Sequence, residues 1–213
     1  SIAASVALAE KYPYFYCAVG HHPHTAKEVQ EGYLDELEQL CRHPKVVAIG
    51  EIGLDYHYDF SPREVQKQVF REQLELAKKL HFPVIIHSRE ATADTLELLH
   101  EYRPEGIVHC FSGSAETAKE ILGLGMYLGF TGVVTFSNAR KVVEAAAVTP
   151  LDRMLIETDC PYMAPVPKRG TRCDSTLLPY TAEVLAGIKG VPVQELIDRT
   201  NENAYTVYRI ARG

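Results

Sequence analysis

Imidazole and carboxylate side chains recur along this chain at one kind of position, directly after a short apolar run. His22 and His24 follow the first run and Glu51 follows the second, while later runs are followed by His87, His109 and Asp159. Histidine nitrogens and carboxylate oxygens are the ligands that divalent Zn, Mn, Fe and Mg ions use in proteins. A divalent ion makes hydroxide available from bound water near neutral pH, so the pattern predicts metal-assisted hydrolysis.

Each of these residues taken alone is explained by an ordinary structural role, such as a hydrogen-bonded histidine or an ion pair. Taken together they favour a cation, because burying several such groups without one leaves them unpaired at high cost. We predict that the metal ligands are Glu51, His87, His109 and Asp159. Glu51 is the candidate for bridging two ions, and Asp159 is the candidate for orienting or deprotonating the attacking water. The donor types do not choose among the metals.

An anionic substrate needs hydrogen-bond donors close to these ligands. His22, His24 and Arg89 are placed for that role, and His22 also counts among the predicted catalytic residues. Weaker candidates for the same role are Lys168, Arg169 and Arg172, because a basic loop that simply faces solvent explains these residues equally well. The formal net charge of −6 argues against gripping nucleic acid by bulk charge, so phosphate recognition is expected to be local.

The apolar runs that precede these residues read as strands covered on both faces. Candidate strands cover residues 15–19, 46–49, 84–86, 106–108, 126–130 and 154–156. Amphipathic stretches separate them, the clearest running from Pro62 to Leu80 with Ser61 as its cap. Further helices are predicted over Ser1–Lys11, Ser175–Ile188 and Pro192–Arg209. This alternation predicts parallel strands, whose carboxyl ends share one edge where chemistry gathers.

The number of strands indicates the architecture. Six strand–helix units in 213 residues predict an α/β fold, a (β/α)8 TIM barrel that lacks its first two strands. The helical pattern at Ser1–Lys11, with no strand before it, agrees with a chain that begins inside a barrel. No linker or composition break appears, so residues 1–213 are predicted to form a single incomplete barrel domain.

Composition excludes several other classes of protein. With 46% apolar and 23% charged residues, the chain is ordinary globular protein. No apolar run is long enough to cross a membrane, and the first residues lack the pattern of a signal peptide. The five cysteines are an odd number with no close pair, which disfavours a disulfide framework and favours a cytoplasmic location.

Four segments in this order and spacing resemble the TatD family of metal-dependent deoxyribonucleases: Gly50–Asp55, His87–Arg89, His109–Gly113 and Glu157–Pro161. The resemblance covers essentially the whole chain. It implies a TIM barrel of the amidohydrolase type and Mg-, Mn- or Zn-supported hydrolysis of DNA phosphodiesters. It also implies 3′-to-5′ exonuclease action on single strands or 3′ ends. Glu51, His87, His109 and Asp159 match the family's metal ligands, and His22 matches its histidine near the scissile phosphate.

The sequence departs from the family pattern at two places. The family opens with a strand carrying a His-x-His pair that supplies two further ligands, and this chain has no such pair. The full-length protein is therefore expected to bind two ions. This chain, which lacks the pair, is expected to bind metal more weakly and to turn over substrate more slowly than the full-length protein. The second departure is at Arg172–Ser175, where the family commonly carries an Asn-Glu-Pro-like segment that contacts substrate.

Two other functions remain open. Related barrels with the same ligands hydrolyse amides, lactones or phosphotriesters, although no lysine stands at a strand end here to be carbamylated, which disfavours amides and lactones. A noncatalytic barrel that acts as a binding protein would also fit the missing ligand pair. Such a scaffold has no physical reason to keep Glu51, His87, His109 and Asp159.

Overall fold

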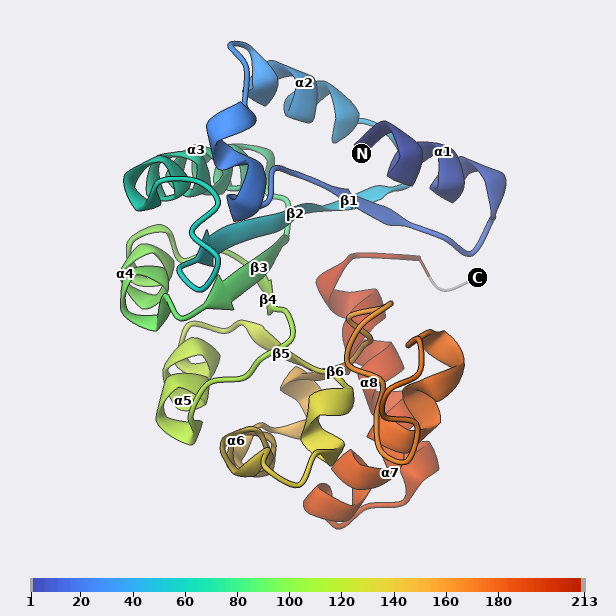
Figure 1. The fold of residues 1–213 in the computed structure, drawn as a ribbon. Helices are drawn as coiled ribbons and strands as arrows, with labels where there is room; N and C mark the ends of the chain where they lie inside the picture. The colour runs from blue at the N-terminus through green and yellow to red at the C-terminus, as the bar shows by residue number, and fades with distance from the viewer. Residues whose placement is uncertain (1, 212–213) are drawn as a thin grey trace. The chain divides into compact units, whose positions relative to one another are not determined.

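The computed structural model describes residues 2–211, which fall into two compact units (Figure 1). The first unit runs to Ile107 and includes Tyr208–Ile210, and the second covers Val108–Val207. The first helix, α1 (Ile2–Lys11), confirms the helix predicted at the start of the chain, with Ser1 outside the described residues.

Parallel strands form the centre of the first unit. They are β1 (Cys17–Val19), β2 (Val46–Asp55) and β3 (Val84–Arg89), with β2 paired to both neighbours. The predicted first strand is too long, because the Phe15 N–H closes a turn onto the Tyr12 carbonyl instead of extending the strand. The predicted second strand is too short, because pairing with β3 continues as far as Asp55 opposite Arg89. Strand β2 therefore contains Glu51.

Strand β2 is irregular at Glu51. Gly50 lies opposite Ile85 and Ile52 lies opposite Ile86, so Glu51 is an extra residue inserted between these two paired positions of β2. Such a bulge redirects the side chain that it carries. Two positions further on, Gly53 has a φ of 144°, and a Cβ there would lie 1.9 Å from the His87 carbonyl oxygen. Only glycine lets β2 approach β3 this closely.

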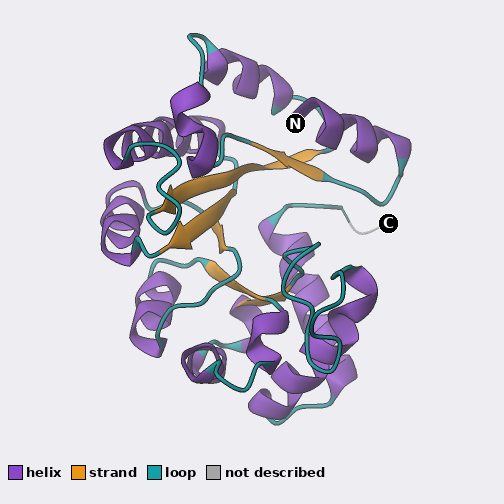
Figure 2. Cartoon of the chain, viewed as in Figure 1, coloured by secondary structure: helices purple, strands orange, loops and turns teal. Residues whose placement is uncertain are grey.

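Helices cover this sheet, as Figure 2 shows. The predicted apolar face of α3 (Arg63–Leu80) is confirmed, with Val69, Phe70 and Leu74 buried. Ser61 does not cap α3, which begins after Pro62 without a side-chain cap. Instead, the Ser61 hydroxyl donates to the His24 carbonyl and accepts from the Lys27 N–H. The other helices of the unit are the 3-10 turn η1 (Pro23–Glu28), α2 (Tyr33–Leu40) and α4 (Thr92–Tyr102).

The second unit continues the strand–helix alternation. Strand β4 (Gly106–Val108) lies at the boundary of the units, followed by β5 (Tyr127–Phe130) and β6 (Met154–Ile156), which pair in parallel. The helices are α5 (Ala115–Gly123), α6 (Arg140–Val148), α7 (Leu178–Lys189) and α8 (Val193–Val207). Short 3-10 turns complete it at η2 (Gly132–Thr135), η3 (Leu151–Arg153) and η4 (Ser175–Leu177). The predicted helix at Ser175 thus begins as η4, and the last helix is shorter than predicted at both ends.

The predicted α/β class, with six parallel strands and flanking helices, is confirmed. The strand residues are mostly buried, and β4 and β5 are buried along their whole length. Strands covered on both faces lose their alternating pattern, which is why their sequences are continuously apolar. Within residues 2–211, no helix is long and apolar enough to cross a membrane.

Candidate metal centre

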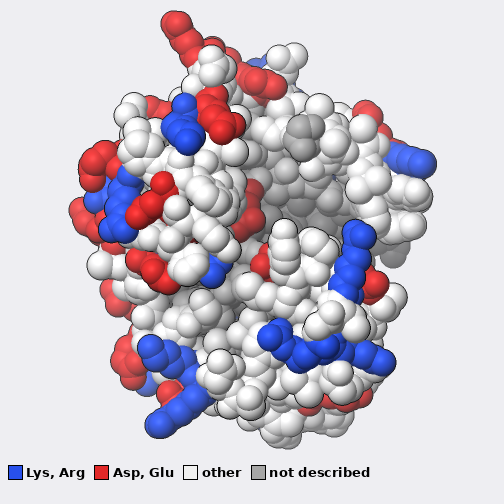
Figure 3. Space-filling model, in the orientation of Figure 1, with Lys and Arg blue, Asp and Glu red and all other residues white. Residues whose placement is uncertain are grey.

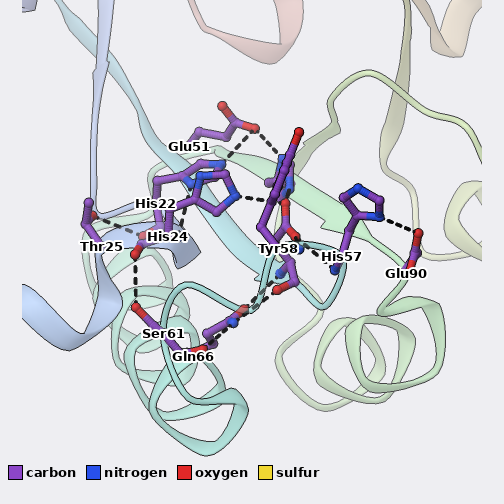
Figure 4. Close-up of polar contacts among 11 residues, drawn as sticks. His22, His24, Thr25, Glu51, His57, Tyr58, Ser61, Gln66 and Glu90 are labelled. Atoms are coloured by element: carbon purple, nitrogen blue, oxygen red, sulfur yellow. Dashed lines mark hydrogen bonds and ion pairs between the residues drawn. The ribbon is translucent and has the colours of Figure 1, made fainter.

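Three side chains of the first unit could hold a metal ion. His22 follows β1, Glu51 lies on the β2 bulge and His87 lies on β3, and their ligand atoms are all within 4.8 Å of one another. Glu51 Oε1 is 2.8 Å from His87 Nδ1 and 3.7 Å from His22 Nε2. Figure 4 shows Glu51 above the histidine rings. Two imidazoles and a carboxylate form a donor set that suits a divalent cation.

Asp55 stands behind this cluster and was not among the site residues predicted from the sequence. Its Oδ2 accepts hydrogen bonds from His24 Nε2 at 2.9 Å and His87 Nε2 at 3.0 Å. Its Oδ1 accepts from the backbone N–H groups of His57 at 3.0 Å and Tyr58 at 2.9 Å. Burial opposes ionisation of this side chain, but these donors outweigh it and lower the pKa of Asp55 to about 2. Asp55 is therefore a buried anion at neutral pH.

This anion decides which nitrogen of His87 is available to a metal. An ionised carboxylate only accepts hydrogen bonds, so His87 Nε2 carries a proton toward Asp55. The other nitrogen, Nδ1, then faces the Glu51 carboxylate at 2.8 Å. A lone pair and a carboxylate oxygen at that distance need a proton or a cation between them. A histidine whose second nitrogen donates to a carboxylate is a common arrangement in metal sites. The residues therefore fit a divalent ion.

His22 offers different chemistry in this structure. Its Nδ1 accepts a hydrogen bond from the His24 backbone N–H at 3.2 Å. Burial lowers the pKa of His22 to about 4, even though Glu51 opposes the shift, so the ring is neutral near neutral pH. A neutral ring that accepts at Nδ1 carries its proton on Nε2, the atom that faces Glu51. In this tautomer the Nε2 atom of His22 is a hydrogen-bond donor, and metal ligation through Nε2 would require its proton to move.

The other predicted substrate-binding residues of the first unit lie beside the same cluster. The His24 ring packs edge-on against His22, with ring centroids 4.3 Å apart. Arg89, at the end of β3, places its guanidinium carbon 4.9 Å from the centre of the Tyr58 ring. The weaker candidates belong to the second unit, where the Arg169 guanidinium carbon lies 3.8 Å from the centre of the Phe136 ring.

A second histidine–carboxylate group lies in the second unit. His109 Nδ1 is 3.0 Å from Glu157 Oε2, and His109 Nε2 is 3.7 Å from Asp159 Oδ1. Glu157 Oε1 also accepts from the Cys110 backbone N–H at 2.6 Å. His109 thus lies between two carboxylates, as His87 does between Glu51 and Asp55. Asp159 was predicted from the sequence to belong to the site, whereas Glu157 was not.

A glycine makes room for Glu157. A Cβ at Gly129, on β5, would lie 2.2 Å from Glu157 Oε1. No titratable residue directly follows β5, where the sequence reads Thr131-Gly132. This strand offers no candidate ligand, and its Gly129 leaves room for the Glu157 carboxyl group. Beside His109, burial raises the pKa of the Cys110 thiol to about 11. Cys110 is therefore a neutral thiol at neutral pH in this structure.

The structure thus places the predicted ligands in two groups, Glu51 with His87 and His109 with Asp159. The missed residues, Asp55 and Glu157, stand in the same strand-end segments as predicted ligands. A second carboxylate in each of those segments was the signal that could have identified them.

On the face drawn in Figure 3, Lys and Arg side chains form short groups among Asp and Glu, in keeping with the net charge of −6.

Comparisons with known proteins agree with this chemistry. Residues 1–209 match the family model described as TatD related DNase. The chain is 46% identical over 213 residues to an uncharacterized metal-dependent hydrolase, YabD, from Bacillus subtilis, covering 99% of this chain and 84% of that protein. It is 36% identical to the 3′-5′ ssDNA/RNA exonuclease TatD of Pantoea vagans, covering 96% and 82%. The crystal structure of YjjV, a TatD homologue from Escherichia coli, superposes with a TM-score of 0.91 at 34% identity, covering 98% of this chain and 82% of that one.

Proposed function

Because the chain belongs to the TatD-related DNase family of metal-dependent hydrolases, we propose that it cleaves DNA phosphodiester bonds with a metal-activated water. The expected substrate is single-stranded DNA, digested from its 3′ end. The observation that carries the proposal is the placement of His87 between Glu51 and Asp55, 2.8 Å and 3.0 Å away. The name of the Pantoea vagans relative supports the choice of nucleic acid as substrate.

The proposal assigns metal ligation to Glu51, His87, His109 and Asp159. A divalent cation, whether Mg, Mn or Zn, would supply an acidified water and neutralise charge on the phosphate, and we expect two such ions at the site. The protein's own part is to hold the ligand atoms in fixed orientations. Asp55 does this for His87, and Glu157 does it for His109. We also propose that residues 1–213 act as one barrel domain.

The remaining polar groups are assigned to the substrate and its protons. The His22 Nε2–H points toward Glu51 Oε1 at 3.7 Å, a separation long enough for a phosphate oxygen to compete for the proton. Asp159, whose side chain is 35% exposed, is assigned to accept the proton of the attacking water. Arg89 and His24 are assigned to bind the phosphate backbone.

The test uses a thymidine oligomer labelled at its 5′ end, so that the label stays on the shortened products, in the presence of Mn²⁺. Wild-type protein is expected to shorten the oligomer and to stop when EDTA is added. Glu51→Gln keeps the size of the side chain but removes its charge, so the rate should fall at least about 100-fold, beyond the usual effect of altering a residue behind a ligand. Glu64→Gln is the matched control, because Glu64 is 85% exposed on α3.

Other outcomes point to the other functions. If the wild type cleaves lactones, amides or phosphotriesters but no oligonucleotide, the chain is a hydrolase of another bond. If Glu51→Gln changes neither the metal content nor the free energy of unfolding, the chain is a noncatalytic barrel. Metal content by elemental analysis and unfolding by denaturant identify the noncatalytic case without an activity measurement.

A further inference from the structure

Two exposed aromatic rings lie beside the candidate metal centre, in the loop between β2 and α3. Tyr58 is 47% exposed and Phe60 is 53% exposed. Their rings stack on each other, with centroids 5.1 Å apart and planes 16° from parallel. None of the proposed roles uses them. Large exposed aromatic pairs of this kind are common at binding surfaces, because burying them on a ligand is favourable.

The rings are close to the groups assigned to the reaction. The His24 ring packs edge-on against both of them, with centroids 5.4 Å from Tyr58 and 4.9 Å from Phe60. The same His24 ring lies 6.2 Å from the His87 ring. The aromatic pair is therefore one side chain away from a predicted metal ligand.

A network of hydrogen bonds holds the loop in this conformation. The Tyr58 N–H donates to Asp55 Oδ1, and the Gln66 amide donates to the carbonyls of Asp55 at 3.1 Å and Ser61 at 2.8 Å. On the outer side, the His57 ring packs against Tyr58 and pairs with Glu90 at 2.7 Å (Figure 4). A surface that is already rigid loses little conformational entropy when a ligand binds it.

A cation lies against the same rings. The Arg89 guanidinium carbon is 4.9 Å from the centre of the Tyr58 ring. The acidic residue that follows Arg89 in the chain, Glu90, pairs with His57. Together the rings and the guanidinium provide the two kinds of group that proteins use to bind single-stranded nucleic acids. The aromatic rings can stack on a base, and the guanidinium can donate hydrogen bonds to a phosphate.

We propose that Tyr58 and Phe60 form a stacking platform for a nucleobase of a single strand, with Arg89 binding the adjoining phosphate. This inference rests on the proposed function and adds the subsite that recognises its substrate. Every base has an aromatic face, so the platform accepts bases without regard to sequence. Bases within a duplex are already stacked on their neighbours, so the platform favours unpaired nucleotides.

The first test measures binding without turnover. A thymidine oligomer and a uridine oligomer, each with a fluorescent label, are titrated with protein in EDTA and followed by anisotropy. Tyr58→Ala and Phe60→Ala are each expected to weaken binding about tenfold, the usual effect of removing one stacking ring. Tyr58→Phe and Phe60→Tyr keep the rings and should bind as the wild type does. Tyr14→Ala is the control, since Tyr14 is 71% exposed in the loop after α1. Comparison of the two oligomers shows whether the protein binds DNA and RNA with different affinities.

The second test asks whether the base itself is recognised. Wild type and variants are compared on oligomers whose 3′-terminal residues carry a base or lack one. If the platform binds a base, the alanine variants lose affinity for the normal oligomer but not for the abasic one. Equal losses on both oligomers, or no loss on either, would overturn the platform. Failure of the proposed function gives a different result, namely that the wild type cleaves neither oligomer in the presence of Mn²⁺. The anisotropy measurement still tests base binding by Tyr58 and Phe60 in that case.

Discussion

The Nε2 atom of His87 lies 3.0 Å from Oδ2 of Asp55, and this contact determines which nitrogen of the ring is offered to a cation. Asp55 is 1% exposed and also holds the His24 ring and two backbone N–H groups of the following loop. One buried carboxylate thus orients a predicted metal ligand and the loop that carries the aromatic platform. Its replacement should disturb the site more than the fold.

Asp55→Asn is expected to weaken metal binding about 10- to 100-fold, in the range found for residues behind metal ligands. The asparagine oxygen can still accept the backbone N–H groups, which leaves its NH2 group facing the two histidine rings. His87 must then accept at Nε2 and carry its proton on Nδ1, toward Glu51. Titration calorimetry with Mn²⁺ measures the loss, with Asp59→Asn as the control because Asp59 pairs with Arg63 at the surface. Unchanged affinity in Asp55→Asn would show that the tautomer does not matter.

Gly129→Ala is expected to lower activity about 10- to 100-fold while changing the free energy of unfolding by less than about 1 kcal/mol. The nearest atoms that an added Cβ meets all belong to the Glu157 carboxyl group, which can swing away. Its movement leaves His109 without the contact at 3.0 Å. Gly123→Ala is the control, because a Cβ there meets nothing within 4 Å. Hydrolysis rates and denaturant unfolding together check the prediction, and a large loss of stability with normal activity would contradict it.

Asp94 should make stability depend on pH in the acid range. Hydrogen bonds from Lys67 at 2.7 Å and Tyr56 at 2.5 Å lower the pKa of Asp94 below its ordinary value. A carboxyl group whose pKa is lower in the folded state stabilises the protein above its unfolded pKa of about 3.9 and loses that effect as the pH falls through the folded pKa. Asp94→Asn should cost about 1 kcal/mol at pH 7, and the difference from wild type should be lost as the pH falls through the folded-state pKa of Asp94.

The measurement for Asp94 is denaturant unfolding of wild type and variant across the acid range. Glu97→Gln, on the exposed side of α4, is the control and should show no such convergence with wild type. A difference between wild type and Asp94→Asn that stays constant down to the lowest pH would rule out the ionic contribution.

Lys189 should matter for stability, although it has no assigned role in the proposed reaction. Its Nζ donates to the carbonyls of Ala147 at 2.9 Å and Thr149 at 2.8 Å, at the end of α6. Carbonyls at a helix end have no partner within the helix, so Lys189→Met should cost about 1–3 kcal/mol. Thermal unfolding measures the loss, and Lys119→Met, at an exposed position on α5, is the control. Equal melting temperatures for the two variants would contradict this role.

The sequence by itself determined the class of fold and the strand ends that carry chemistry. Continuously apolar runs alternating with amphipathic stretches predict parallel strands, because both faces of such strands are covered. The predicted helix at Pro62–Leu80 differs from α3 by a single residue at its start, since a long apolar periodicity leaves little choice of element. Glu51, His87, His109 and Asp159 were identified because they follow apolar runs.

Only the tertiary structure decided the roles of Asp55, Glu157 and Gly129. A bulge at Glu51 and continued pairing to Arg89 bring Asp55 behind His87, and neither feature has a pattern in the local sequence. The space that Gly129 leaves for Glu157 depends on β5 and β6 pairing side by side. Apolar periodicity reports which residues are buried, whereas orientation of a polar side chain depends on partners that are distant in the chain. That is why candidate ligands could be proposed from the sequence, whereas the carboxylates that contact them could not.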